Sequence, residues 1–218
     1  MSSAAEVQTV AAALEQSSSP AVDLQTIAHE LRQPLSAIES IAYYLSLVLP
    51  RDSRAARSKV SRLQQLVEQS NWILMSALQL AEIAPLSLQA VNLEELITQT
   101  VTSRVMHGDR RICLELTGGL PLVSLDPGRG RALLENLLTL FRQLSSDQHP
   151  VRVRTSAGEG SVSLGFAAAV PGYQSEASLG PGCSLSIQSA RRVVEQHGGT
   201  FSIHVDSASG ISVMVVLP

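Results

Sequence analysis

Two long segments near the N-terminus carry apolar residues at intervals of three and four, the spacing of one face of an α-helix. The first segment begins at Asp23, a residue type that caps helix N-termini, and ends before Pro50. The second runs from about Ser53 to Ile83 and is closed by Pro85. The apolar positions of the first segment are Ile27, Leu31, Leu35, Ile38, Ala42, Leu45 and Leu49. The pattern predicts two long helices joined by a short turn, an antiparallel hairpin.

A lone pair of helices cannot enclose both apolar faces. Each predicted helix is about 40 Å long at about 1.5 Å per residue, so the exposed apolar stripe would be extensive. Pairing two hairpins into a four-helix bundle covers this surface. The chain is therefore expected to form a homodimer through its hairpin.

After Pro85 the pattern changes to a mixture of helical and strand-like segments. Helices are expected over 93–106, 129–144 and 184–197, and strands over 112–116, 122–125, 151–155, 162–167, 200–205 and 212–217. Gly198 and Gly199 give the last helix a C-terminal stop signal. This order predicts one sheet layered against helices, and hence an α+β protein with a helical hairpin followed by a two-layer α/β sandwich.

Three units follow from these patterns. Residues 1–22 are rich in Ala, Ser and Gln and are expected to be a flexible lead-in, residues 23–85 form the hairpin, and residues 86–218 form the α/β domain.

Composition narrows the possible partners. Hydrophobic residues make up 44% of the 218 residues and charged residues 16%, which is enough apolar material for a packed core. A net charge of −3 and 3% aromatic residues argue against nucleic acid, which requires phosphate-neutralising charge and stacking rings. No apolar run reaches the roughly 18 residues that a membrane span needs. We therefore expect a cytoplasmic protein that binds neither nucleic acid nor membrane, and no metal site, since the histidines are not spaced with cysteines or carboxylates as metal ligands are.

His29 lies on the polar side of the first predicted helix. At about 100° per residue it is nearly opposite the apolar stripe and is expected to point into water. Glu30 and Arg32 flank it, and Gln33 lies one turn further along the same face. A lone surface histidine is most often a solvated side chain without a role, so the position alone decides nothing.

The segment IAHELRQPLSAI, residues 27–38, resembles the phosphoacceptor box of sensor histidine kinases. That box has a histidine, then an acidic residue, and a proline five residues after the histidine, and His29, Glu30 and Pro34 match it. Proline inside a helix costs about 3 kcal/mol, so its retention here needs a reason. The resemblance implies that His29 accepts a phosphoryl group on the first helix of a dimeric bundle.

The neighbouring residues suit this chemistry. A neutral imidazole is a good nucleophile toward phosphorus near neutral pH. Glu30 would hold the other ring nitrogen as N–H, while Arg32 would pair with phosphoryl oxygens or an acidic partner, with plain surface ion pairing equally open. Gln33 stands where the resemblance implies Thr or Asn, residues that help a water attack the phosphorylated partner. Because a carboxamide also orients water, we hypothesise weak phosphatase activity through Gln33.

The rest of the chain resembles the ATP-binding domain of the same kinases. Gly180 to Pro218 looks like the second glycine box, its helix, a His-Gly-Gly turn and two closing strands. Relics of the ATP site are expected at Asn136, Gly172, Gly180 and Gly182.

Several residues that the resemblance requires for nucleotide are replaced. Leu140 stands at the position of a magnesium-binding asparagine, although magnesium demands oxygen ligands. Ala168 stands at the adenine-binding aspartate and Val170 at a glycine. Only residues 173–179 separate the two glycine boxes, so the segment that would cover the phosphates is nearly deleted. This predicts a retained scaffold that binds no cofactor, with ATP not expected.

The sequence thus predicts a phosphorelay protein, a histidine phosphotransferase that carries phosphate on His29 to and from response-regulator receiver domains. The receiver would supply Mg²⁺, and the chain would have no ATP-dependent kinase activity of its own. Two alternatives stay open: a divergent ATP-dependent sensor histidine kinase core, and a non-catalytic adaptor that binds a response regulator.

Overall fold

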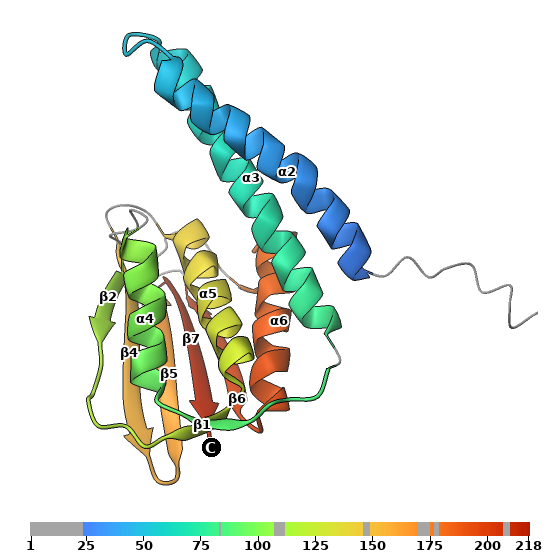
Figure 1. Ribbon diagram of the computed structural model, residues 1–218. Coiled ribbons are helices and arrows are strands. Elements are labelled where there is room, and N and C mark those ends of the chain that lie inside the picture. The colour runs from blue at the N-terminus through green and yellow to red at the C-terminus, as the bar shows by residue number, and fades with distance from the viewer. Residues whose placement is uncertain are drawn as a thin grey trace, which may run out of the picture.

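A computed structural model describes residues 24–82, 84–106, 112–145, 149–169, 175–176, 179–206 and 210–218. It consists of a helical hairpin that leans on a layered α/β domain (Figure 1). The predicted lead-in and Gly172 lie outside the described residues. The predicted fold class, a hairpin followed by an α/β sandwich, is confirmed.

The hairpin consists of α2 (Leu24–Val48) and α3 (Arg54–Ala81). Helix α2 continues through Pro34. Ala28 and Ala42 are fully buried, because small side chains allow close contact between α2 and α3. The Arg57 guanidinium closes the turn by donating to the Leu49 carbonyl at 3.1 Å.

Part of the apolar face of α2 remains uncovered in the single chain. Ile27, Leu31 and Ile38 are between 38% and 48% exposed, although their spacings of four and seven residues place them on one stripe. Exposed apolar patches of this kind mark interaction surfaces.

The α/β domain is built on a five-stranded sheet of order β2-β4-β5-β7-β6, in which only β2 and β4 are parallel. Its strands are β2 (Ile112–Glu115), β4 (Val151–Gly158), β5 (Ser161–Ala168), β6 (Thr200–Asp206) and β7 (Gly210–Leu217). Three helices cover one face of this sheet (Figure 1): α4 (Leu93–Met106), α5 (Pro127–Leu144) and α6 (Pro181–Gln196).

The core lies between the sheet and these helices. Buried and less buried positions alternate along β5, and Phe166 stacks on Phe141 of α5 with ring centroids 5.7 Å apart. Large aromatic side chains at this contact fix the distance between helix layer and sheet.

Two local expectations were wrong. Helix α6 begins at Pro181 rather than Ser184, so Gly182, placed in the preceding loop, is helical. Proline is favoured in the first helical turn, where its missing N–H costs no hydrogen bond. A short strand β1 (Gln89–Val91), which pairs antiparallel with β3 (Val123–Leu125), was also missed. It has only three residues and is not buried, so it lacks the alternation that marks a strand.

Candidate functional site

His29 is exposed in the second turn of α2. Its neighbour Ala28 is fully buried and holds the helix against α3, so the next residue is rotated about 100° away from that contact. The exposure expected from the sequence is therefore found, while the phosphoacceptor role of His29 stays a prediction.

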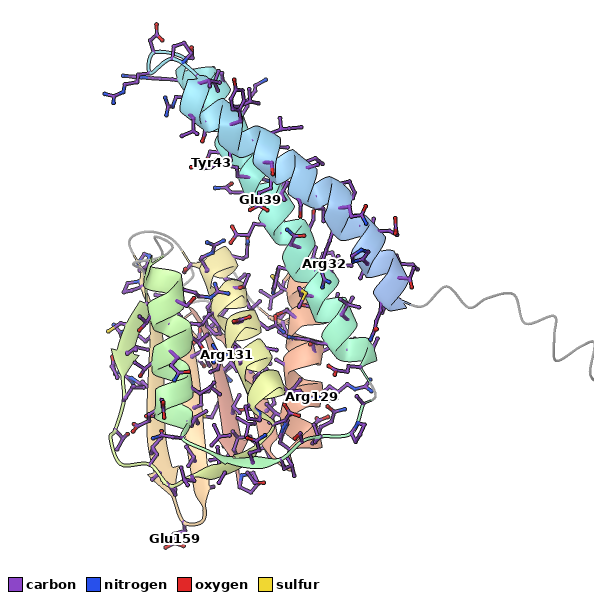
Figure 2. The ribbon with its side chains drawn as sticks, viewed as in Figure 1. Arg32, Glu39, Tyr43, Arg129, Arg131 and Glu159 are labelled. Atoms are coloured by element: carbon purple, nitrogen blue, oxygen red, sulfur yellow. The ribbon has the colours of Figure 1, made fainter. Side chains whose placement is uncertain are left out.

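The three other predicted site residues are all exposed, and Arg32 also contacts α3. Glu30 and Gln33 are exposed like His29. Arg32 reaches across the hairpin, where its guanidinium donates to the Met75 sulfur at 2.7 Å. Figure 2 shows Arg32 on the part of α2 that lies beside α3. This cation is thus held one turn from His29, in a position to attract an anionic group there.

Asn136, the first predicted relic of an ATP site, is only 5% exposed in the middle of α5. Its carboxamide oxygen accepts hydrogen bonds from the Trp72 indole N–H at 2.9 Å, from the Ser76 hydroxyl at 3.3 Å and from the Ser186 hydroxyl. Its nitrogen donates to the Ser186 carbonyl at 3.2 Å and to Gln79 at 3.4 Å. The hydrogen-bonding capacity of this amide is used within the protein.

The positions that would complete a nucleotide site are apolar. Leu140 is fully buried and Ala168 is 4% exposed, and both belong to the hydrophobic core. Neither offers an oxygen to magnesium or a carboxylate to adenine. The residues described at these positions do not fit a magnesium–nucleotide complex.

The two glycines of the second box have different surroundings. A Cβ on Gly182 would lie 3.2 Å from the Ile73 side chain and 3.5 Å from the Trp72 ring, whereas one on Gly180 would meet nothing within 4 Å. Gly182 therefore lies directly beneath α3.

Sequence reasoning missed the link between hairpin and domain. Asp126 caps α5 by accepting from the Gly128 and Arg129 amides, and its other oxygen accepts from the Ser87 amide at 2.9 Å. These hydrogen bonds, that of Ser87 first, lower the pKa of Asp126, with burial opposing them. Arg129 donates to the Ala84 carbonyl at 2.6 Å and so fixes the same connection. The Asp-Pro pair before a helix indicates the cap of α5, but it does not indicate the hydrogen bond that Asp126 accepts from the Ser87 amide.

His197 has a structural role beside Asp126. Its Nε2 accepts from the Asp126 amide at 3.0 Å and its Nδ1 lies 2.7 Å from the Val193 carbonyl. This arrangement requires the neutral tautomer with the proton on Nδ1. His197 therefore belongs to the turn that ends α6.

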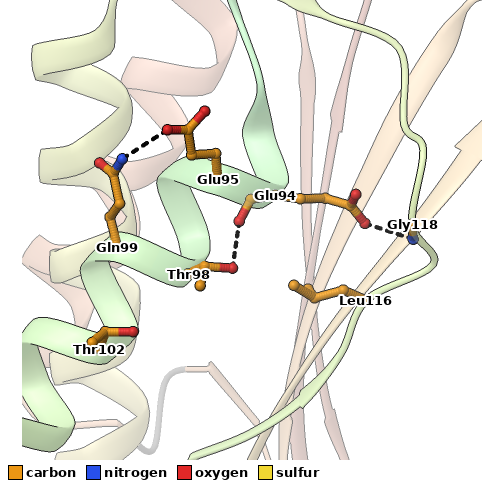
Figure 3. A pocket seen from close by; sticks show the side chains of 7 residues that line it. All are labelled: Glu94, Glu95, Thr98, Gln99, Thr102, Leu116 and Gly118. Carbon is orange, nitrogen blue, oxygen red and sulfur yellow. Dashed lines mark hydrogen bonds between the residues drawn. The ribbon is translucent and has the colours of Figure 1, made fainter.

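A cavity of about 740 Å³ lies over α4 and the loop after β2 (Figure 3). Glu94 at its rim accepts from the Gly118 amide at 2.8 Å, and Gln99 donates to Glu95 at 3.0 Å. Glu94 thus holds α4 to the loop after β2, while Glu95 is paired within α4. Helix α4 lies on the other side of α5 from α6 (Figure 1).

The described part of the chain holds no cluster of three or more metal-ligating side chains. None of its helices is long and apolar enough to cross a membrane.

Comparison with known proteins finds similar sequences among sensor histidine kinases. The sensor histidine kinase ZraS of Klebsiella oxytoca is 28% identical over 200 residues, which cover 84% of this chain and 42% of the relative. ZraS of Escherichia coli strain K12 is 27% identical over 205 residues, covering 88% and 44%. No protein-family model matches the chain.

Solved structures agree in fold. Full-length ShkA in complex with AMPPNP covers 89% of the chain at 24% identity and a TM-score of 0.59, with 45% of that protein matched. The histidine kinase AdeS of Acinetobacter baumannii covers 87% at 14% identity and a TM-score of 0.55, with 96% of that chain matched. The chain has the fold of the sensor histidine kinase catalytic core. The hairpin and the α/β domain both fall within the region that is similar to ZraS.

The comparisons bear on the question of ATP. The chain spans less than half the length of the curated relatives that it matches. Those relatives are named sensor kinases, and ShkA was solved with a nucleotide analogue. They support the alternative of an ATP-dependent kinase core better than the prediction of a phosphotransferase without kinase activity.

Proposed function

We propose that this histidine kinase core works as a histidine phosphotransferase, in which His29 receives a phosphoryl group from a receiver-domain aspartate and passes it to another. The observation that carries the proposal is an exposed His29 within a matching phosphoacceptor box on α2. An aspartyl phosphate can approach only a histidine that is accessible from solvent.

The transfer is a simple displacement at phosphorus. An imidazole nitrogen of His29 attacks, the new N–P bond forms, and the P–O bond to the aspartate breaks, leaving a carboxylate. Glu30 holds the proton on the other ring nitrogen, and Arg32, held beside Met75, attracts the phosphoryl oxygens. The receiver supplies its own Mg²⁺.

A homodimer is part of this proposal. The partly exposed stripe of Ile27, Leu31 and Ile38 matches the surface that a second hairpin would cover. It lies on the other side of α2 from His29, so dimerisation leaves the histidine accessible.

The lack of kinase activity is proposed from the domain's own residues. Asn136 is saturated by internal hydrogen bonds, and Leu140 and Ala168 offer no ligand atoms. The second candidate, an ATP-dependent kinase core, is favoured by the similarity to ZraS. The third, an adaptor that only binds a response regulator, predicts unchanged signalling after His29→Ala.

Phosphotransfer from a labelled receiver tests the proposal. The protein is incubated with receiver domains of the same genome that have been phosphorylated with ³²P. Wild type should gain an acid-labile label and His29→Ala none, whereas His204→Ala, which removes another exposed histidine on β6, should behave as wild type. A label that survives His29→Ala, or no label from any receiver, would refute the assignment.

A further inference from the structure

Helix α3 is shared between the hairpin and the α/β domain. It packs against α2 on one side and against α5 and α6 on the other (Figure 1). On the domain side Trp72 is 7% exposed and Ser76 is 1% exposed, values typical of a protein core rather than of a hinge between mobile parts.

The contact is centred on Asn136. Two of the three groups that donate to its oxygen, Trp72 and Ser76, come from α3, and the third, Ser186, comes from α6. A single buried amide thus connects three helices. If α3 moved away, the amide would lose two donors and would need replacements from solvent.

Gly182 allows α3 to come this close. The absence of a side chain at the start of α6 leaves room for Ile73 and the Trp72 ring, which lie 3.2 and 3.5 Å from where a Cβ would be. A larger residue would have to displace them.

Further contacts continue along the same face of α3. Gln79 accepts from the Ser189 hydroxyl of α6 at 2.9 Å, and Glu68, about three turns earlier, forms an ion pair with Arg142 of α5. Beyond the end of α3, Arg129 holds the connection through the Ala84 carbonyl. The contact between α3 and the α/β domain therefore has polar interactions at both ends. Its centre consists of apolar side chains and the Asn136 amide.

We propose that α3 takes the place of a ligand on the surface formed by Asn136 and Gly182. Trp72 and Ile73 occupy this surface and exclude nucleotide. They also join the hairpin and the α/β domain into one rigid body. The residues that the histidine kinase resemblance assigns to nucleotide are thereby used to set the position of the hairpin. This inference concerns the joint between the two parts and holds whether or not His29 carries a phosphoryl group.

Trp72 is the only tryptophan in the chain, so its fluorescence reports this contact directly. Wild type should show blue-shifted emission and little acrylamide quenching. Gly182→Val should shift the emission to the red and raise the quenching constant several-fold, with the far-UV circular dichroism unchanged. The matched control is Gly180→Val, two residues away in open space, which should leave both signals as in wild type.

A second variant guards against misfolding of Gly182→Val. Ile73→Asp puts a charge into the same contact from the other side, at a residue whose side chain is 36% exposed, and should give the same red shift. The proposal is wrong if both variants keep the wild-type emission, or if Trp72 of wild type is quenched as freely as a solvated indole.

Addition of a magnesium complex of AMPPNP tests exclusion of nucleotide. Emission of wild type should not change up to millimolar concentrations. A saturable change would show that nucleotide binds and displaces α3, which would overturn the proposal. None of these measurements depends on phosphotransfer, so their failure is distinct from a failure of transfer between His29 and receivers.

Discussion

Two carboxamide side chains of this protein, Gln33 and Asn136, lie in the regions to which the histidine kinase resemblance assigns chemistry, but their surroundings are opposite. Gln33 is exposed on α2, on the same side as His29, and Asn136 is buried in α5 with five hydrogen bonds. The first is accessible from solvent. The second is committed to holding the fold together.

The comparison teaches that the hairpin presents its carboxamide to solvent, whereas the α/β domain uses its carboxamide for internal hydrogen bonds. The same residue type contributes to function when it faces solvent and to stability when burial leaves it no water to bind. Sequence similarity to kinases reports the common fold and is silent on this difference.

The largest effect is expected at the uncovered stripe of α2. Ile38→Lys should convert the homodimer into a monomer, because it places a charge where a second hairpin would exclude water. Sedimentation equilibrium measures the mass. Leu47→Lys, an equally apolar exposed residue on the side of His29, is the control and should stay dimeric. A monomeric wild type would show that the stripe has another role.

The next largest effect is expected on stability, where substitution of the two carboxamides should give different losses. Asn136→Ala leaves the Trp72 N–H and two hydroxyls without their acceptor, and should lower the free energy of unfolding by about 3 kcal/mol. Gln33→Ala should change it by less than about 0.5 kcal/mol. Urea denaturation at neutral pH measures both, and equal losses would contradict the assignment of different roles.

Asp126 should give a smaller, pH-dependent effect. Its pKa is lowered in the folded protein by the amides of Ser87 and Arg129, so the carboxylate stabilises the fold above the pKa of the unfolded chain, about 3.9. This contribution is lost as the pH falls through the lower, folded-state pKa. Asp126→Asn should therefore be less stable than wild type at pH 7, and the difference measured by thermal unfolding should shrink as the pH falls below about 4. A difference independent of pH would exclude this cause.

The smallest effect is expected on the phosphatase reaction. Gln33→Ala should slow dephosphorylation of a receiver while leaving transfer to His29 intact, because only the former needs an oriented water. Release of inorganic phosphate from the labelled receiver measures it. An unchanged rate would show that Gln33 takes no part.

Much of the fold could be predicted because its signals are local. Helix α4 has the predicted bounds, and the strands alternate as expected where one face is buried. The exposure of His29 followed from the helical stripe alone. These features depend on periodicity, which a sequence displays directly.

The joint between hairpin and domain could not be predicted, since it depends on residues far apart in sequence. The indole of Trp72 meets Asn136 across 64 positions, and Asp126 both caps a helix and anchors Ser87. Nothing near Trp72 distinguishes a donor to a buried amide from ordinary packing. Only the three-dimensional structure shows that the Trp72 indole is buried against the Asn136 amide.

The central claim is that His29 takes its phosphoryl group from receivers and not from nucleotide. One preparation of the protein should be divided between [γ-³²P]ATP with Mg²⁺ and a ³²P-labelled receiver, with His29→Ala alongside in both. The account predicts label on wild type from the receiver alone. Label from ATP on wild type, absent in His29→Ala, would contradict it and identify the chain as an active kinase core.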